Sequence, residues 1–271
     1  MKFHIHMPIL VKLKVTITKC FLGVTLLSIS FWAAATDTLP NLIVRIKPSV
    51  LAVGFYQETQ NPRFGFSGTG FVVGDGHLLV TNAHVVERAT VTIDDASLVV
   101  HSLGGSGQAG IRRAEVIYVD KAHDLALLRF DGSLLPPVEL GKTDLIREGQ
   151  SVAFMGFPLG NALGLTPVTH RGIVSAITSV ALPSPTSRQL DSRAINRIKE
   201  GAFEFIQLDA TAYPGNSGGP LFDVETGTVV GVVNMVALKG TRESALTHPS
   251  GITYAIPVEF VVRLMTTGLQ K

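Results

Sequence analysis

The stretch Tyr213-Pro214-Gly215-Asn216-Ser217-Gly218-Gly219-Pro220-Leu221 determines how this 271-residue chain is interpreted. Glycines and prolines surround Ser217, so the backbone must turn tightly and leave room for another group to approach closely. A serine nucleophile needs such a setting, because the N–H groups of Gly215 and Ser217 can then converge on the oxyanion formed in acyl transfer. A loop built only for turning uses the same residue types, so the stretch alone leaves both interpretations open.

Two upstream segments favour the nucleophile. His84 follows the apolar run Leu79–Thr81, and Asp124 precedes another, Leu125–Leu128. A serine hydroxyl is a weak nucleophile at neutral pH, so it needs a histidine base, and that base needs a carboxylate to fix its tautomer. The order His84, Asp124, Ser217 is the order of the chymotrypsin triad and differs from the subtilisin and α/β-hydrolase orders.

These segments together resemble the HtrA/Deg serine proteases of the trypsin-like superfamily. The resemblance extends from about Leu39 to Leu264 and is carried by five motifs in the family's order: Gly68-Thr69-Gly70-Phe71, Thr81-Asn82-Ala83-His84-Val85-Val86, Asp124-Leu125-Ala126-Leu127-Leu128, Pro214-Gly215-Asn216-Ser217-Gly218-Gly219-Pro220 and Tyr254-Ala255-Ile256-Pro257. It implies a triad in which Ser217 attacks, His84 shuttles the proton and Asp124 orients His84.

Short β-type runs separated by turn residues predict an all-β fold of two six-stranded antiparallel β-barrels, trypsin-like, with a short C-terminal helix. The polar segment Asp131–Glu148, with its Pro136-Pro137 pair, reads as the connector between the barrels. The strands are predicted at Val50–Tyr56, Gly68–Val73, His77–Thr81, Thr90–Ile93, Ala114–Val119, Leu125–Phe130, Ser151–Phe157, Val168–Thr178, Phe203–Leu208, Pro220–Phe222, Thr228–Val236 and Ile252–Ile256.

Residues 1–35 are predicted to be a signal peptide. Lysines up to Lys19, an apolar run from Cys20 and the small residues Ala33–Ala35 form the typical three regions. An uncleaved membrane anchor is the alternative, although Cys20–Ala35 is 16 residues long and a spanning helix needs ~20. The first barrel, with the predicted base and orienting carboxylate, is assigned to residues 36–135. The second, with the predicted nucleophile and a closing helix, is assigned to residues 136–271.

Composition excludes several other functions. The chain is 46% hydrophobic, which argues against disorder. Removing the four lysines of the first 35 residues from the 23 bases leaves 19 bases against 21 acids, so no basic surface for nucleic acid is expected. Cys20 is the only cysteine, and no HExxH or CxxC pattern occurs, so we expect neither disulfides nor a metal or organic cofactor. The G-x-G-x-x-G at Gly105–Gly110 precedes a β-like run and is interpreted as a hairpin loop.

The other histidines receive no catalytic role. His123 precedes Asp124 directly, and neighbours on an extended strand point to opposite faces, so His123 is not expected to face the cleft. His77, His101, His170 and His248 lie near turns or charged residues and are expected at the surface.

By resemblance, Thr211 occupies the base of the substrate pocket, and Val232, Val233 and Asn234 line its wall and pair with the substrate backbone. The pocket base has no carboxylate, so we expect cleavage after small or aliphatic residues and not after Lys or Arg. Asn216 stands where trypsin zymogens place an aspartate that pairs with a new amino terminus. A neutral amide cannot form that ion pair, so activation by amino-terminal processing is not expected.

Two segments concern regulation. In HtrA relatives a loop at the position of Leu182–Glu204 relays activating signals, and an insertion without regulatory effect is the alternative. The closing helix is predicted at Pro257–Met265, and six residues follow it, so no PDZ domain is expected. That expectation puts carboxyl-terminus sensing in doubt.

The sequence thus predicts an exported, periplasmic or otherwise secreted serine endopeptidase that acts on unfolded or damaged polypeptides. The alternative from another class is a non-catalytic, protease-like chaperone or envelope scaffold. A processing protease with one substrate is a further alternative that the sequence does not separate. Contact with a membrane is expected only if residues 1–35 stay attached, and although homotrimers are common among HtrA relatives, no residue decides the oligomeric state.

Overall fold

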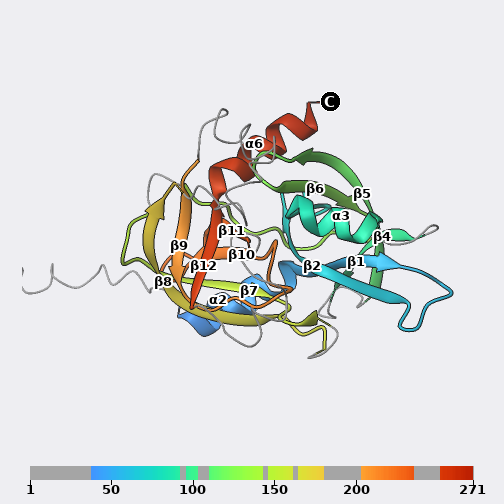
Figure 1. The fold of residues 1–271 in the computed structure, drawn as a ribbon, viewed down its shortest axis with the longest axis horizontal. Coiled ribbons are helices and arrows are strands. Elements are labelled where there is room, and N and C mark those ends of the chain that lie inside the picture. The colour runs from blue at the N-terminus through green and yellow to red at the C-terminus, as the bar shows by residue number, and fades with distance from the viewer. Residues whose placement is uncertain are drawn as a thin grey trace, which may run out of the picture. The chain divides into compact units, whose positions relative to one another are not determined.

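The computed structural model describes residues 38–91, 96–102, 110–142, 146–160, 164–179, 203–234 and 251–270. The predicted signal peptide, most of the Leu182–Glu204 loop and His248 lie outside these ranges. The described residues belong to one compact unit, Asp37–Lys271, built from two closed β-barrels (Figure 1). Two six-stranded antiparallel barrels of the trypsin-like type, followed by a C-terminal helix, confirm the predicted fold.

The first barrel closes in the strand order β1-β2-β3-β6-β5-β4, and every neighbouring pair is antiparallel. Its strands are β1 (Val50–Tyr56), β2 (Phe64–Val73), β3 (Leu78–Thr81), β4 (Ser97–Ser102), β5 (Gly110–Asp120) and β6 (Leu125–Phe130). The second barrel closes in the order β10-β11-β12-β9-β8-β7. Its strands are β7 (Ser151–Gly156), β8 (Val168–Thr178), β9 (Phe205–Asp209), β10 (Pro220–Asp223), β11 (Val229–Asn234) and β12 (Ile252–Pro257).

The strand predicted at Thr90–Ile93 is wrong at its start, because Thr90 lies in the last turn of a helix. This helix, α3 (Ala83–Val91), buries Val85, Val86 and Ala89 in the core of the first barrel. The β-branched residues favour a strand by propensity, but burial of one helical face overrides that preference. The fourth strand of the barrel follows later, as β4.

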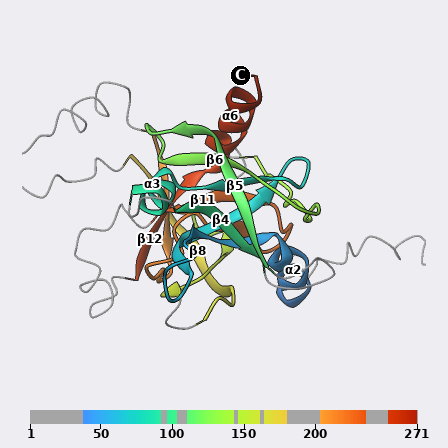
Figure 2. The ribbon, with the colours of Figure 1, turned by 90° about the vertical axis from the view of Figure 1, so that its right-hand side faces the viewer.

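Two helices flank the barrels, and Figures 1 and 2 show them on opposite sides of the described unit. Helix α2 (Leu39–Ile46) precedes a short 3₁₀ helix, η1 (Lys47–Ser49), and buries Leu42 and Ile46, which lie one turn apart. Helix α6 (Val258–Leu269) begins after Pro257 and contacts β5, β6 and β11, so it touches both barrels. Among the described residues, no helix combines the length and apolar character needed to cross a membrane.

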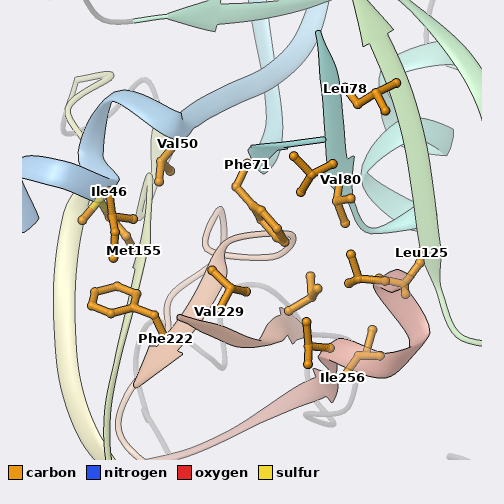
Figure 3. Packing of buried hydrophobic residues seen from close by; sticks show 14 of the residues in the cluster. Ile46, Val50, Phe71, Leu78, Val80, Leu125, Met155, Phe222, Val229 and Ile256 are labelled. Atoms are coloured by element: carbon orange, nitrogen blue, oxygen red, sulfur yellow. The ribbon is translucent and has the colours of Figure 1, made fainter. Parts of the chain in front are cut away.

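The barrels share a hydrophobic core. Figure 3 shows Phe71, Val80 and Leu125 of the first barrel facing Phe222, Val229 and Ile256 of the second. All six side chains are fully buried. Burial of one such side chain contributes about 1.5–3 kcal/mol. This shared core fixes the two barrels against each other, so residues from different barrels can hold a constant geometry.

Candidate active site

The predicted orienting residue Asp124 ends a turn between β5 and β6. Its φ of 52° lies in the left-handed region, which non-glycine residues seldom adopt. The Asp120 carboxylate holds this turn by accepting hydrogen bonds from the N–H groups of Ala122 and His123, at 3.1 and 3.2 Å. These two bonds fix the backbone that presents the Asp124 side chain.

His123 belongs to a different cluster from Asp124. Its Nδ1 lies 2.6 Å from Asp120 Oδ2, and its ring stacks on Phe260 at 4.1 Å. His123 was expected not to face the cleft because neighbours on an extended strand point to opposite faces, and that reason is wrong. The two residues lie in a turn and not on an extended strand.

The Asp124 carboxylate binds His84 through both of its oxygens. Oδ2 lies 2.6 Å from His84 Nδ1, and Oδ1 accepts the His84 backbone N–H at 2.9 Å. His84 is the second residue of α3, so the carboxylate also stabilises an N–H group in the first turn of the helix. In the tautomer that fits this contact, His84 Nδ1 carries the proton and donates it to Asp124 Oδ2, and Nε2 is then the basic nitrogen of the ring.

Two asparagines that the sequence analysis did not connect with Asp124 also bind it. Asn234 Nδ2, at the end of β11, donates to Asp124 Oδ2 at 3.0 Å. Asn82 Nδ2 donates to the Asp124 carbonyl oxygen at 3.0 Å, and the N–H of Ala83 donates to the same oxygen at 3.1 Å. Asp124 is therefore held from both barrels.

The glycines around Ser217 are required by backbone geometry. The Asn216 N–H donates to the Tyr213 carbonyl at 3.0 Å, and Gly215 has a φ of 107°. This is a type II turn, with proline and glycine at its two central positions. A Cβ atom at Gly215 would overlap the Phe157 carbonyl oxygen. The tight bend predicted from the sequence is therefore present.

The two N–H groups predicted to bind an oxyanion are those of Gly215 and Ser217. Neither donates a hydrogen bond within the described ranges. Both are thus unengaged by that part of the chain, as an oxyanion site requires.

The Ser217 loop lies against the first turn of α3. A Cβ atom placed on Gly68 would meet a Val85 methyl at 2.6 Å and the Ser217 carbonyl oxygen at 3.1 Å. His84 Nε2 is buried and has no hydrogen-bond partner in the described part of the chain, so its bond to the Ser217 hydroxyl is not made in this conformation. Such bonds are often long without substrate. The structure therefore brings the three predicted triad residues into one site with the base unengaged.

The predicted pocket residues lie in different surroundings. Thr211, the predicted base of the pocket, is half-buried and precedes the nucleophile loop. Val232 lies in the core between the barrels and Val233 in the core of the second barrel, and both are fully buried. Their strand, β11, pairs with β10 and β12 on its two sides, and the N–H and carbonyl of Val233 already bond to the backbone of Gly219 and Gly218 at 2.9 Å. The prediction that Val232 and Val233 pair with the substrate backbone is therefore wrong. The side chain of Asn234 binds Asp124 instead of facing outward. Thr253 was not predicted: its Oγ1 accepts the Ala212 N–H at 3.0 Å beside this base.

Three of the histidines expected at the surface, His77, His101 and His170, are half-buried. The His77 ring lies 6.0 Å from the Phe130 ring. His170 stacks on Phe154 at 4.8 Å and lies 6.2 Å from the Tyr213 ring, and His101 lies 5.7 Å from the Phe64 ring. Burial lowers the pKa of the His101 and His170 imidazoles below their ordinary value. The burial of His101 and His170 could not be predicted, because both follow polar or β-branched neighbours. Across the described residues, no three His, Cys, Asp or Glu side chains gather as potential metal ligands.

Comparisons with known proteins agree with this geometry. The family model described as "Trypsin-like peptidase domain" matches residues 68–232. "Protease Do-like 5, chloroplastic" from Arabidopsis thaliana is 30% identical over 238 residues, which cover 82% of this chain and 67% of the relative. "Probable periplasmic serine endoprotease DegP-like" from Halomonas elongata is 33% identical over 192 residues, 71% of this chain and 33% of the relative. The chain thus spans about a third of that bacterial relative's length.

Solved structures of the same type also match. "HtrA-type protease AlgW with decapeptide" has a TM-score of 0.62 at 23% identity, covering 86% of this chain and 68% of that one. "Crystal structure of Deg5" has a TM-score of 0.58 at 28% identity, covering 83% of this chain and 90% of that one. The two-barrel fold and its site define the trypsin-like class of serine proteases. Within that class, the chain belongs to the HtrA/Deg family.

Proposed function

We propose that this protein is an exported serine endopeptidase that uses Ser217 as nucleophile, His84 as general base and Asp124 as the group that orients the base. The observation that carries the proposal is the double contact of Asp124 with His84, at 2.6 Å to Nδ1 and 2.9 Å to the backbone N–H. It supports an imidazole held with Nδ1 towards Asp124, whose other nitrogen, Nε2, has no partner in the described residues.

The proposed reaction follows from these positions. When a substrate carbonyl enters, Ser217 Oγ attacks its carbon and passes its proton to His84 Nε2. The imidazolium that results is stabilised by the Asp124 carboxylate. The N–H groups of Gly215 and Ser217 stabilise the oxyanion, and His84 then protonates the leaving amine. Water hydrolyses the acyl-enzyme by the reverse set of proton transfers.

We further propose that the substrates are unfolded or damaged polypeptides, cleaved after small or aliphatic residues. The uncharged neighbours Thr211, Ala212 and Thr253 support this preference, because none of them can pair with a Lys or Arg side chain. Export, with the periplasm as destination, is supported by the charged and apolar regions of residues 1–35 and by the word "periplasmic" in the name of the Halomonas relative. The division into domains 36–135 and 136–271 would place the site between the barrels.

Digestion of denatured casein and of folded proteins by the purified chain tests this function. Fluorogenic peptides with Val, Ala, Leu, Lys or Arg before the scissile bond test the preference. We expect casein cleavage that Ser217→Ala and His84→Ala both abolish, with aliphatic peptides preferred. Dominant cleavage after Lys or Arg would contradict the pocket assignment. Suppression of casein aggregation without cleavage, equal in wild type and Ser217→Ala, would favour the non-catalytic chaperone instead.

A further inference from the structure

Thr69, on β2 of the first barrel, is fully buried, and both its backbone and its side-chain hydroxyl make hydrogen bonds. Its backbone N–H donates to the Ser217 carbonyl at 2.9 Å, and its hydroxyl donates to the Gly215 carbonyl at 2.6 Å. The same hydroxyl oxygen accepts the Phe157 N–H at 3.1 Å. One residue of the first barrel thus binds both ends of the Gly215–Ser217 segment and the end of β7 in the second.

The hydroxyl of Thr69 acts on the two peptide units next to the oxyanion donor. The Gly215 carbonyl, which it binds directly, belongs to the peptide that follows this donor. The peptide that contains the Gly215 N–H has the Pro214 carbonyl on its other side, and that carbonyl accepts the Leu159 N–H at 2.7 Å. Leu159 lies in the turn that begins at Phe157, which the Thr69 hydroxyl also holds.

These bonds set the direction of one N–H group. In a trans peptide the N–H points away from the carbonyl, so a Pro214 carbonyl held by Leu159 turns the Gly215 N–H to the opposite side. A glycine at this position can rotate its peptide at low cost, because types I and II of the turn differ by such a rotation and glycine accepts both. The backbone at Gly215 therefore needs an external restraint to keep one orientation.

We propose that Thr69 is a positioning residue for the oxyanion donor: its hydroxyl joins the Gly215 carbonyl to the Phe157 N–H and so keeps the Gly215 N–H in its productive direction. The inference rests on the proposed function. It adds a residue of the first barrel, outside the triad, that controls transition-state stabilisation in the second. Close packing supports the assignment, since a Cβ atom at Gly156 would meet Thr69 Oγ1 at 3.0 Å and Asn216 Oδ1 at 2.7 Å.

The test compares Thr69→Val and Thr69→Ala, which remove the hydroxyl, with Thr69→Ser, which keeps it. We expect the first two to lower kcat about 10- to 100-fold with little change in KM, because loss of one oxyanion donor costs about 100- to 1000-fold and a misdirected donor costs less. Affinity for a peptide boronic acid, which binds as a tetrahedral anion, should fall with kcat, while affinity for a product peptide should not. Thr69→Ser should restore both kcat and boronate affinity.

Thr81→Val is the matched control. Thr81 is also fully buried, and its hydroxyl donates to the Thr69 carbonyl at 2.6 Å, so its loss costs stability without freeing the Gly215 carbonyl. We expect a lower unfolding midpoint with most of kcat retained. Equal losses of kcat in Thr81→Val and Thr69→Val, or an unchanged kcat in Thr69→Val, would overturn the inference alone. A wild-type chain that neither cleaves peptides nor binds the boronate would overturn the proposed function as well.

Discussion

Replacement of Asn234 by alanine tests how strongly Asp124 depends on its third donor. The Asp124 carboxylate accepts bonds from His84 Nδ1, from the His84 N–H and from Asn234 Nδ2, at 2.6, 2.9 and 3.0 Å. A hydrogen bond to a charged group contributes about 1.5–3 kcal/mol. The Asp124 side chain is 26% exposed, so water can partly replace the lost donor and about 1–2 kcal/mol remains.

If the transition state loses this stabilisation of about 1–2 kcal/mol (about 5- to 30-fold in rate), kcat/KM of Asn234→Ala decreases by that factor. Asn234→Asp should lose more, because a second carboxylate beside Asp124 Oδ2 disfavours the ionised pair. The assay is hydrolysis of a fluorogenic peptide at neutral pH, with the unfolding midpoint measured for each variant.

Gln207→Ala is the control, since it removes a side-chain amide whose partner is the Ser175 hydroxyl at 3.3 Å. It should leave kcat/KM unchanged. An Asn234→Ala variant with the wild-type kcat/KM, or a Gln207→Ala variant with an equal loss, would refute the reasoning.

Three further predictions concern stability. Gly218→Ala should lower the free energy of unfolding by about 3 kcal/mol or more in urea titrations, because φ is 85° and a Cβ would overlap the Thr69 carbonyl oxygen. Burial lowers the pKa of His170 below 6.5, so the unfolded chain binds the proton more readily than the folded chain. The free energy of unfolding should therefore decrease as the pH falls below about 6.5. His170→Phe should make that decrease smaller. Burial raises the pKa of Asp223, but hydrogen bonds led by Gln150 outweigh it and lower this pKa below 3.8. Stability from Asp223 is therefore lost only in stronger acid, and Gln150→Ala should move that loss to higher pH.

The parts of the site that could be predicted are those with local sequence signals. The glycines around Ser217 predict a tight turn, and the apolar runs beside His84 and Asp124 predict strands next to these two residues. The alternation of β-type runs with turn residues was sufficient to predict two β-barrels. These features depend on neighbours within a few positions, which one sequence displays directly.

The contacts that could not be predicted join residues far apart in the chain. Asn234 and Asp124 are separated by 110 positions, and Thr69 and Gly215 by 146. Nothing in the composition around Thr69 distinguishes a strand threonine from one whose hydroxyl holds a turn in the other barrel. Such long-range contacts are set by how the two barrels pack. The left-handed backbone of Asp124 was not predicted either, because aspartate adopts this conformation more often than most residues but the preference does not show where it does so.

Reaction of the purified chain with a fluorophosphonate, followed by mass spectrometry of the adduct, tests the central claim that Ser217 and His84 form a working nucleophile. The wild type should carry the label on Ser217, and Ser217→Ala and His84→Ala should each abolish it. An adduct on another residue, labelling that persists in Ser217→Ala, or no labelling of the wild type even with unfolded casein present would contradict the account.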